Sequence, residues 1–143
     1  MSHIELRLRD ALKRDQVSVV GVQLSTFDVP TNATADLDET SGLVTFRFKY
    51  IDDEPAGPSQ RLSDDISIDV GKNSGKLLAV RVNFKRYKAG TMRVSFHKAI
   101  DEMDRAFAKT IREQRVFHRR KNYELVRSVI DENRTSVESA LAG

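Results

Sequence analysis

The sequence predicts an α+β protein in which an antiparallel sheet is followed by C-terminal helices. Between residues 17 and 85, apolar and polar residues alternate, as in strands with one buried face. Between residues 92 and 141, apolar residues instead recur every three to four positions, as in amphipathic helices. The 143 residues are enough for one buried core. We therefore expect a single domain over residues 1–143, with a sheet region at 17–85 and a helical region at 92–141.

A short amphipathic helix is expected at the N-terminus, over residues 3–14. Ile4 and Leu8 are spaced one helical turn apart and begin an apolar stripe. Ser2 and Glu5 stand in the arrangement of a capping box, in which each side chain bonds a backbone amide of the first turn. This segment therefore predicts a helix that precedes the sheet.

A four-stranded antiparallel meander is expected next. Residues 28–38, which include Pro30 and Asn32, are expected to form a loop, because these residues favour turns. The other connections are short, and parallel strands would need long crossovers. The expected strands cover residues 17–27, 44–50, 66–70 and 78–84.

The helical region carries two apolar stripes separated by charged residues. Either one long helix or a pair of helices with a bend near residues 118–122 fits this pattern. We expect the first stripe to cover one face of the sheet. The second stripe lies far along the chain and predicts packing on a second copy, in a homodimer. The first stripe is Phe96, Ile100, Met103, Phe107 and Ile111, and the second is Tyr123, Val126, Ile130, Val137 and Leu141.

Residues 38–82 resemble a family of small bacterial domains called domain of unknown function 2283. The matching pieces are an acidic turn and strand at 38–48, a strand at 65–70 and a strand at 75–82. The turn at 72–75 lacks the acidic residue of the family pattern. The resemblance implies part of a fold and no activity. The order of elements is also similar to that of export chaperones of the SecB type, which are oligomers.

Positive charge is concentrated in one segment of the chain. Residues 85–121 hold twelve Lys and Arg but only four Asp and Glu, whereas both flanking segments are mildly acidic. Clustered cations can neutralise phosphates, and an interleaved Tyr87 could stack on a base. The alternative is a solvated helix surface whose charge is partly offset by Asp101, Asp104 and Glu113. The candidate nucleic-acid-binding residues are Lys85, Arg86, Lys88, Arg112, Arg115, Arg119, Arg120 and Lys121.

No catalytic, cofactor or metal constellation is expected. The chain has no Cys and no phosphate-binding or nucleophile-elbow motif. His97 and Asp101 would share a helix face, but a metal site needs three or four ligands. The carboxylates at 52–54 and 64–65 are expected to be solvated. The sequence therefore predicts a non-enzymatic binding module for nucleic acid or another acidic partner, or alternatively a structural or chaperone-like oligomer.

A cytoplasmic location is expected from the same composition. No apolar run approaches the roughly 20 residues that span a bilayer, and residues 1–10 are too charged for a signal peptide. The lack of Cys suits a reducing compartment. We therefore expect no membrane partner.

Overall fold

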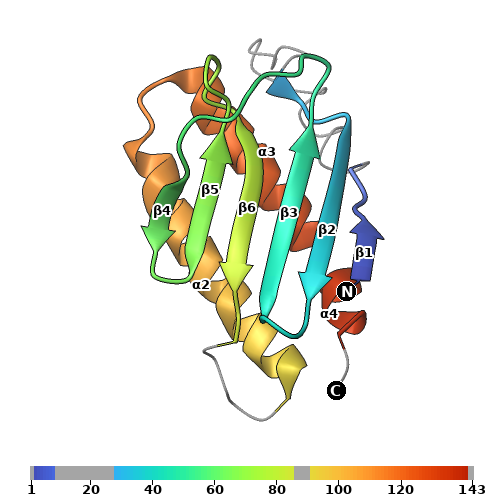
Figure 1. The fold of residues 1–143 in the computed structure, drawn as a ribbon. Helices are drawn as coiled ribbons and strands as arrows, with labels where there is room; N and C mark the ends of the chain where they lie inside the picture. The colour runs from blue at the N-terminus through green and yellow to red at the C-terminus, as the bar shows by residue number, and fades with distance from the viewer. Residues whose placement is uncertain (1, 9–27, 86–90, 142–143) are drawn as a thin grey trace.

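The computed structural model describes residues 2–8, 28–85 and 91–141. In this part of the chain, six antiparallel strands form one sheet in the order β1-β2-β3-β6-β5-β4, and all the helices lie behind one face of it (Figure 1). The strands are β1 (Ser2–Glu5), β2 (Asn32–Asp38), β3 (Leu43–Lys49), β4 (Gln60–Ser63), β5 (Ile66–Val70) and β6 (Leu77–Asn83). The helices are α2 (Met92–Glu113), α3 (Phe117–Glu132) and α4 (Arg134–Ser139).

The predicted α+β class, the antiparallel pairing and the C-terminal helices are confirmed. In β3, Val44, Phe46 and Phe48 are buried, while Arg47 and Lys49 are exposed, as their alternation predicts. The helical region is neither one long helix nor only a pair, because α4 follows α3 after Asn133, and the expected bend corresponds to the break between α2 and α3. The break falls at residues 114–116, slightly before the charged stretch where the bend was expected.

The predicted N-terminal helix is wrong for its first residues. Residues 2–5 form β1, in which His3 pairs with Asp36 and Glu5 pairs with Thr34. The following Leu6 is buried and continues the contact by donating its N–H to the Ala33 carbonyl at 2.8 Å. Pairing with a neighbouring strand outweighs a local helical pattern of only a few residues. The rest of that helix after residue 8, and the strand predicted at 17–27, lie outside the described residues.

The predicted loop at 28–38 is wrong for residues 32–38, which form β2. Ala33, Ala35 and Leu37 face the core in strict alternation. Ala35 lies opposite Phe46 across the strand pair, so a small side chain makes room for a large one. Ala and Asp are poor strand formers in isolation, which is why this strand was missed. The short β4 was missed as well, so the sheet has six strands in the described residues rather than four.

The inward face of β6 differs from the prediction at one end. Leu77 is fully buried while Leu78 is only partly buried, the reverse of the predicted alternation. The pairing with β5 shifts there, because Asp69 pairs with Ala79 but Val70 pairs with Leu77. The extra residue is a β-bulge, which turns the start of the strand.

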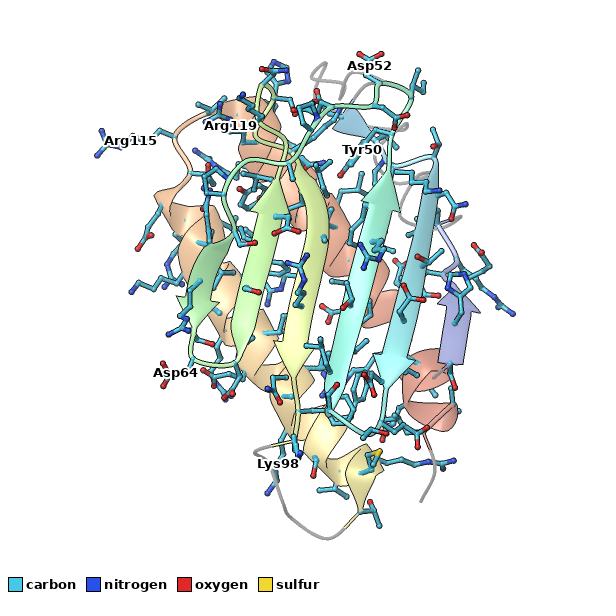
Figure 2. The ribbon with its side chains drawn as sticks, viewed as in Figure 1. Tyr50, Asp52, Asp64, Lys98, Arg115 and Arg119 are labelled. Carbon is cyan, nitrogen blue, oxygen red and sulfur yellow. The ribbon has the colours of Figure 1, made fainter. Side chains whose placement is uncertain are left out.

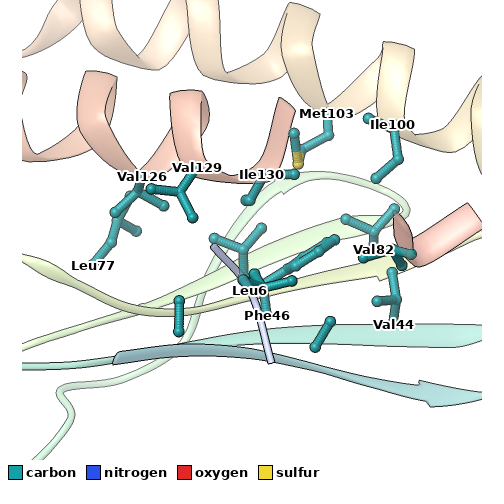
Figure 3. Packing of buried hydrophobic residues seen from close by; sticks show 14 of the residues in the cluster. Leu6, Val44, Phe46, Leu77, Val82, Ile100, Met103, Val126, Val129 and Ile130 are labelled. Atoms are coloured by element: carbon teal, nitrogen blue, oxygen red, sulfur yellow. The ribbon is translucent and has the colours of Figure 1, made fainter. Parts of the chain in front are cut away.

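Both apolar stripes of the helical region are buried within one chain. Figure 3 shows Ile100, Met103 and Ile130 pointing from the helices toward the sheet, where Phe46 and Val82 meet them. The stripe that suggested a second copy is thus already covered by the sheet and by α2. Its members Tyr123, Val126, Ile130, Val137 and Leu141 are all at most 4% exposed.

The other face of the sheet is polar. Arg81 binds Asp69, with 2.9 Å between Nη1 and Oδ1, and Arg47 Nε lies 3.3 Å from Asp36 Oδ2. His3 Nδ1 lies 2.6 Å from the other carboxylate oxygen of Asp36, Oδ1. Charges of both signs are therefore paired across neighbouring strands. Among the described helices, none is long and apolar enough to cross a membrane.

Candidate binding site at the turn between α2 and α3

The structure separates the predicted site residues into two places. Lys85 follows the end of β6 and lies against Gly42, in the turn between β2 and β3. Arg119 instead contacts Ser74, in the loop before β6 begins. At about 3.3 Å per residue, the length of β6 keeps these ends roughly 25 Å apart. Arg86 and Lys88 lie outside the described residues.

The remaining cations gather where α2 ends and α3 begins. We call residues 112–121 the α2–α3 corner. Figure 2 shows Arg115 and Arg119 at this end of the molecule, and Lys98 at the opposite end. Two exposed apolar residues lie among the cations: Val116 is 47% exposed and Phe117 is 39% exposed. The cations of the corner are Arg112, Arg115, Arg119, Arg120 and Lys121.

Backbone carbonyls hold two of these arginines in place. Arg120 donates from Nε and Nη2 to the Gln114 carbonyl, at 3.2 and 3.0 Å, and so satisfies the C-terminal end of α2. Arg119 Nε donates to the Ser74 carbonyl at 3.1 Å. It lies against Gly75, where φ is +77° and a Cβ would come within 2.4 Å of that nitrogen. Within the described part of the chain neither guanidinium has a carboxylate in ion-pair range, so no internal ion pair offsets the charge of either one.

The rest of the corner adds one paired cation and an uncapped helix end. Lys121 Nζ lies 3.4 Å from Glu124 Oε2 and 5.7 Å from the centre of the Phe117 ring. Val116 is the N-cap of α3 but offers no side-chain hydrogen bond, and the first turn holds no acidic residue. The positive end of the helix dipole therefore adds to the charge of the arginines.

A buried polar network fixes α3 to the sheet beneath the corner. The Asn122 side chain accepts the Leu77 N–H at 2.8 Å and donates to the Tyr50 hydroxyl at 3.0 Å and to the Asp28 carbonyl at 2.9 Å. Tyr50 in turn donates to the Leu77 carbonyl at 2.6 Å. Burial raises the pKa of the Tyr50 hydroxyl, so it stays a donor. The corner is thus built on a rigid base.

An acidic hollow borders the corner. It has a volume of about 580 Å³ and lies between the loop after β3 and the loop before β6. The Glu54 carboxylate accepts the N–H groups of Asn73 and Ser74 at 3.0 Å each, and Lys76 Nζ lies 3.8 Å away. Burial opposes ionisation of Glu54, but these hydrogen bonds and Lys76 lower its pKa below the usual value. The lining residues are Asp28, Ile51, Asp52, Asp53, Glu54, Asn73, Ser74 and Lys76.

The hollow is the part of this site that sequence reasoning missed. Asp52 and Asp53 are exposed as expected, whereas the Glu54 side chain is mostly buried. No local pattern connects these carboxylates to Asp28 or to Lys76. Their common position depends on the sheet, in which antiparallel pairing places the end of β3 beside the start of β6. This position could have been predicted only from the knowledge that β3 and β6 pair.

His97 and Asp101 share a helix face as expected, with 3.7 Å between Nε2 and Oδ2, and the Arg134 guanidinium binds both residues. Arg134 Nη2 donates to the His97 carbonyl at 2.6 Å and to Asp101 Oδ1 at 2.7 Å, and lies 2.9 Å from His97 Nδ1. The pair therefore anchors α4 to α2. In residues 2–8, 28–85 and 91–141, no group of three or more His, Cys, Asp or Glu side chains could hold a metal ion.

Comparison with known proteins does not add a relative. No protein-family model, curated protein or solved structure matches this chain significantly. The resemblances to domain of unknown function 2283 and to SecB-type chaperones stay predictions. A functional proposal therefore rests on the geometry of the corner.

Proposed function

We propose that this protein is a non-enzymatic binding module whose α2–α3 corner docks an acidic partner. The observation that supports this most is the gathering of five cations with two exposed apolar side chains within residues 112–121. The combination supplies both long-range attraction and apolar contact area.

The corner is preorganised for such a role. Arg119 and Arg120 are held by carbonyls rather than neutralised by carboxylates. Binding therefore orders fewer side chains than a set of free arginines would. Arg112 and Arg115 are exposed and extend the same charge into solvent. An acidic partner can reach these residues without breaking a contact of the fold.

The structure also decides which variant tests the proposal. Replacing Arg119 and Arg120 would remove bonds to Ser74 and Gln114 and so disturb the fold. Replacing Arg112 and Arg115 with Glu changes charge at the exposed part of the corner. The matched control replaces Lys85 and Lys98 with Glu, which makes the same change in net charge away from the corner.

The measurement is the affinity for a fluorescent acidic peptide, at low and at physiological salt. We expect the Arg112→Glu, Arg115→Glu variant to lose affinity about tenfold, equivalent to roughly 1.4 kcal/mol. The wild-type affinity should fall as salt rises, because salt screens exposed charges. The control variant should bind almost as the wild type does. An equal loss in both variants would show that net charge, and not the corner, governs binding.

A further inference from the structure

We infer that the partner of the α2–α3 corner is a protein rather than a nucleic acid. Its docking segment would be an acidic polypeptide stretch with an apolar residue that covers Val116 and Phe117. This inference rests on the proposed function and names the class of partner. The acidic hollow supports this choice of partner, because it acts as a repulsive element beside the cations.

The hollow and the corner are joined by direct contacts. His118 Nδ1 lies 3.8 Å from Asp28 Oδ2, and Asp28 lines the hollow. Arg119 binds the Ser74 carbonyl, while the N–H of Ser74 binds Glu54. One residue therefore separates the arginine from the carboxylate. A ligand group that reaches Arg119 also reaches the edge of the hollow.

The charge of the hollow acts on such a ligand. Hydrogen bonds keep the pKa of Glu54 low, so it is ionised at neutral pH. Asp28, Asp52 and Asp53 line the same space, and Lys76 offsets only part of their charge. Charges act over a Debye length of about 8 Å at physiological salt. The carboxylates therefore repel an anion bound at the near side of the corner.

A nucleic acid strand that runs along the two arginines meets this repulsion. In Figure 2, Arg115, Arg119 and Asp52 follow one another along this end of the molecule. A strand that contacts the two arginines in turn continues toward the hollow, with a phosphate at every nucleotide. A polypeptide can place its carboxylates at the arginines and uncharged or basic residues beyond them. The positive charges of the corner and the negative charges of the hollow thus favour a polypeptide partner.

The apolar part of the corner leads to the same conclusion. Single-stranded nucleic acids bind by stacking successive bases on aromatic side chains. Here Lys121 Nζ lies over one face of Phe117, and the His118 ring meets Phe117 edge-on at 6.1 Å. The Lys121 ammonium group therefore competes with a base for that face of the ring. Val116 and the exposed part of Phe117 instead form a contact for an aliphatic side chain.

The experiment compares two probes of equal net charge, an acidic peptide with one central Leu and an oligothymidylate. The wild type should bind the peptide more tightly at the same salt. The Asp52→Asn, Asp53→Asn variant should gain affinity for the oligothymidylate by about threefold or more, since like charges in contact oppose binding. Its affinity for the peptide should stay within about twofold of the wild type. The matched control is the Glu39→Gln, Asp64→Asn variant, and Figure 2 shows Asp64 at the opposite end of the molecule. This control variant should change the affinity for neither probe.

The outcomes separate the two proposals. If the oligothymidylate binds as tightly as the peptide and Asp52→Asn, Asp53→Asn has no effect, the partner class is wrong, while the corner remains a binding site. If neither probe binds the wild type or any variant, the proposed function fails, and this inference fails with it.

Discussion

At the scale of single residues, Asn122 connects more of the molecule than any local pattern suggests. It is 1% exposed, and its amide bonds the start of β6, the end of β3 and the backbone at Asp28. Leu77 places its side chain in the core and both backbone groups in this network. A buried amide with all of these partners fixes one position of α3 on the sheet.

We expect Asn122→Leu to destabilise the fold by about 2–4 kcal/mol, because it leaves the buried Leu77 N–H without its acceptor. Urea unfolding followed by circular dichroism measures this. Asn73→Ala, at an exposed position in the neighbouring loop, serves as the control and should stay near the wild-type free energy of unfolding. A loss at Asn122 no greater than that of the control would show that the network contributes little.

At the scale of elements, the contact between α2 and α3 holds carboxylates from both helices. Desolvation between the two helices, together with the charge and hydrogen bond of Asp104, raises the pKa of Asp131 to about 6, although the residue keeps an exposed surface and Arg127 and Arg134 oppose the shift. Arg127 Nε lies 3.3 Å from Asp104 Oδ1 and offsets part of the repulsion. The Asp131 carboxyl group therefore keeps its proton more readily in the folded state than in the unfolded state.

This shift gives stability a definite dependence on pH. A raised carboxyl pKa means that the folded state binds the proton more tightly than the unfolded state, so its contribution is full below about pH 4 and is lost as pH rises through about 6. We expect Asp131→Asn to be more stable than the wild type near pH 7 and to lose this advantage near pH 4. Urea unfolding of both proteins between pH 4 and pH 7 measures this difference in the free energy of unfolding. A constant difference at every pH would contradict the assignment.

At the scale of the whole molecule, the sheet and helices enclose one core that uses both apolar stripes of the helical region. The homodimer predicted from the second stripe is still a prediction, but the stripe itself faces the core of its own chain. Substitution within it should therefore act on folding rather than on association.

We expect Ile130→Asp to destabilise the chain by about 3–5 kcal/mol, because it places a charge at a position that is fully buried. Unfolding experiments combined with light scattering distinguish this outcome from loss of a dimer. Exposed Val94→Asp on α2 is the control and should remain folded. A folded monomer of Ile130→Asp, obtained from a dimeric wild type, would show that the stripe is an interface instead.

The sequence by itself determined the fold class, the alternation of β3, the first helical stripe and the concentration of cations, because each depends on neighbours within a few residues. It did not determine β2, whose alanines become a strand only between β1 and β3, nor the bulge at Leu77, which depends on pairing with β5. Tertiary structure alone decided that Lys85 lies far from Arg119 and that an acidic hollow borders the corner. The physical reason for the hollow is that strand pairing joins residues distant in sequence. Lys85 and Arg119 lie apart because the length of a strand separates residues that the sequence places in one segment.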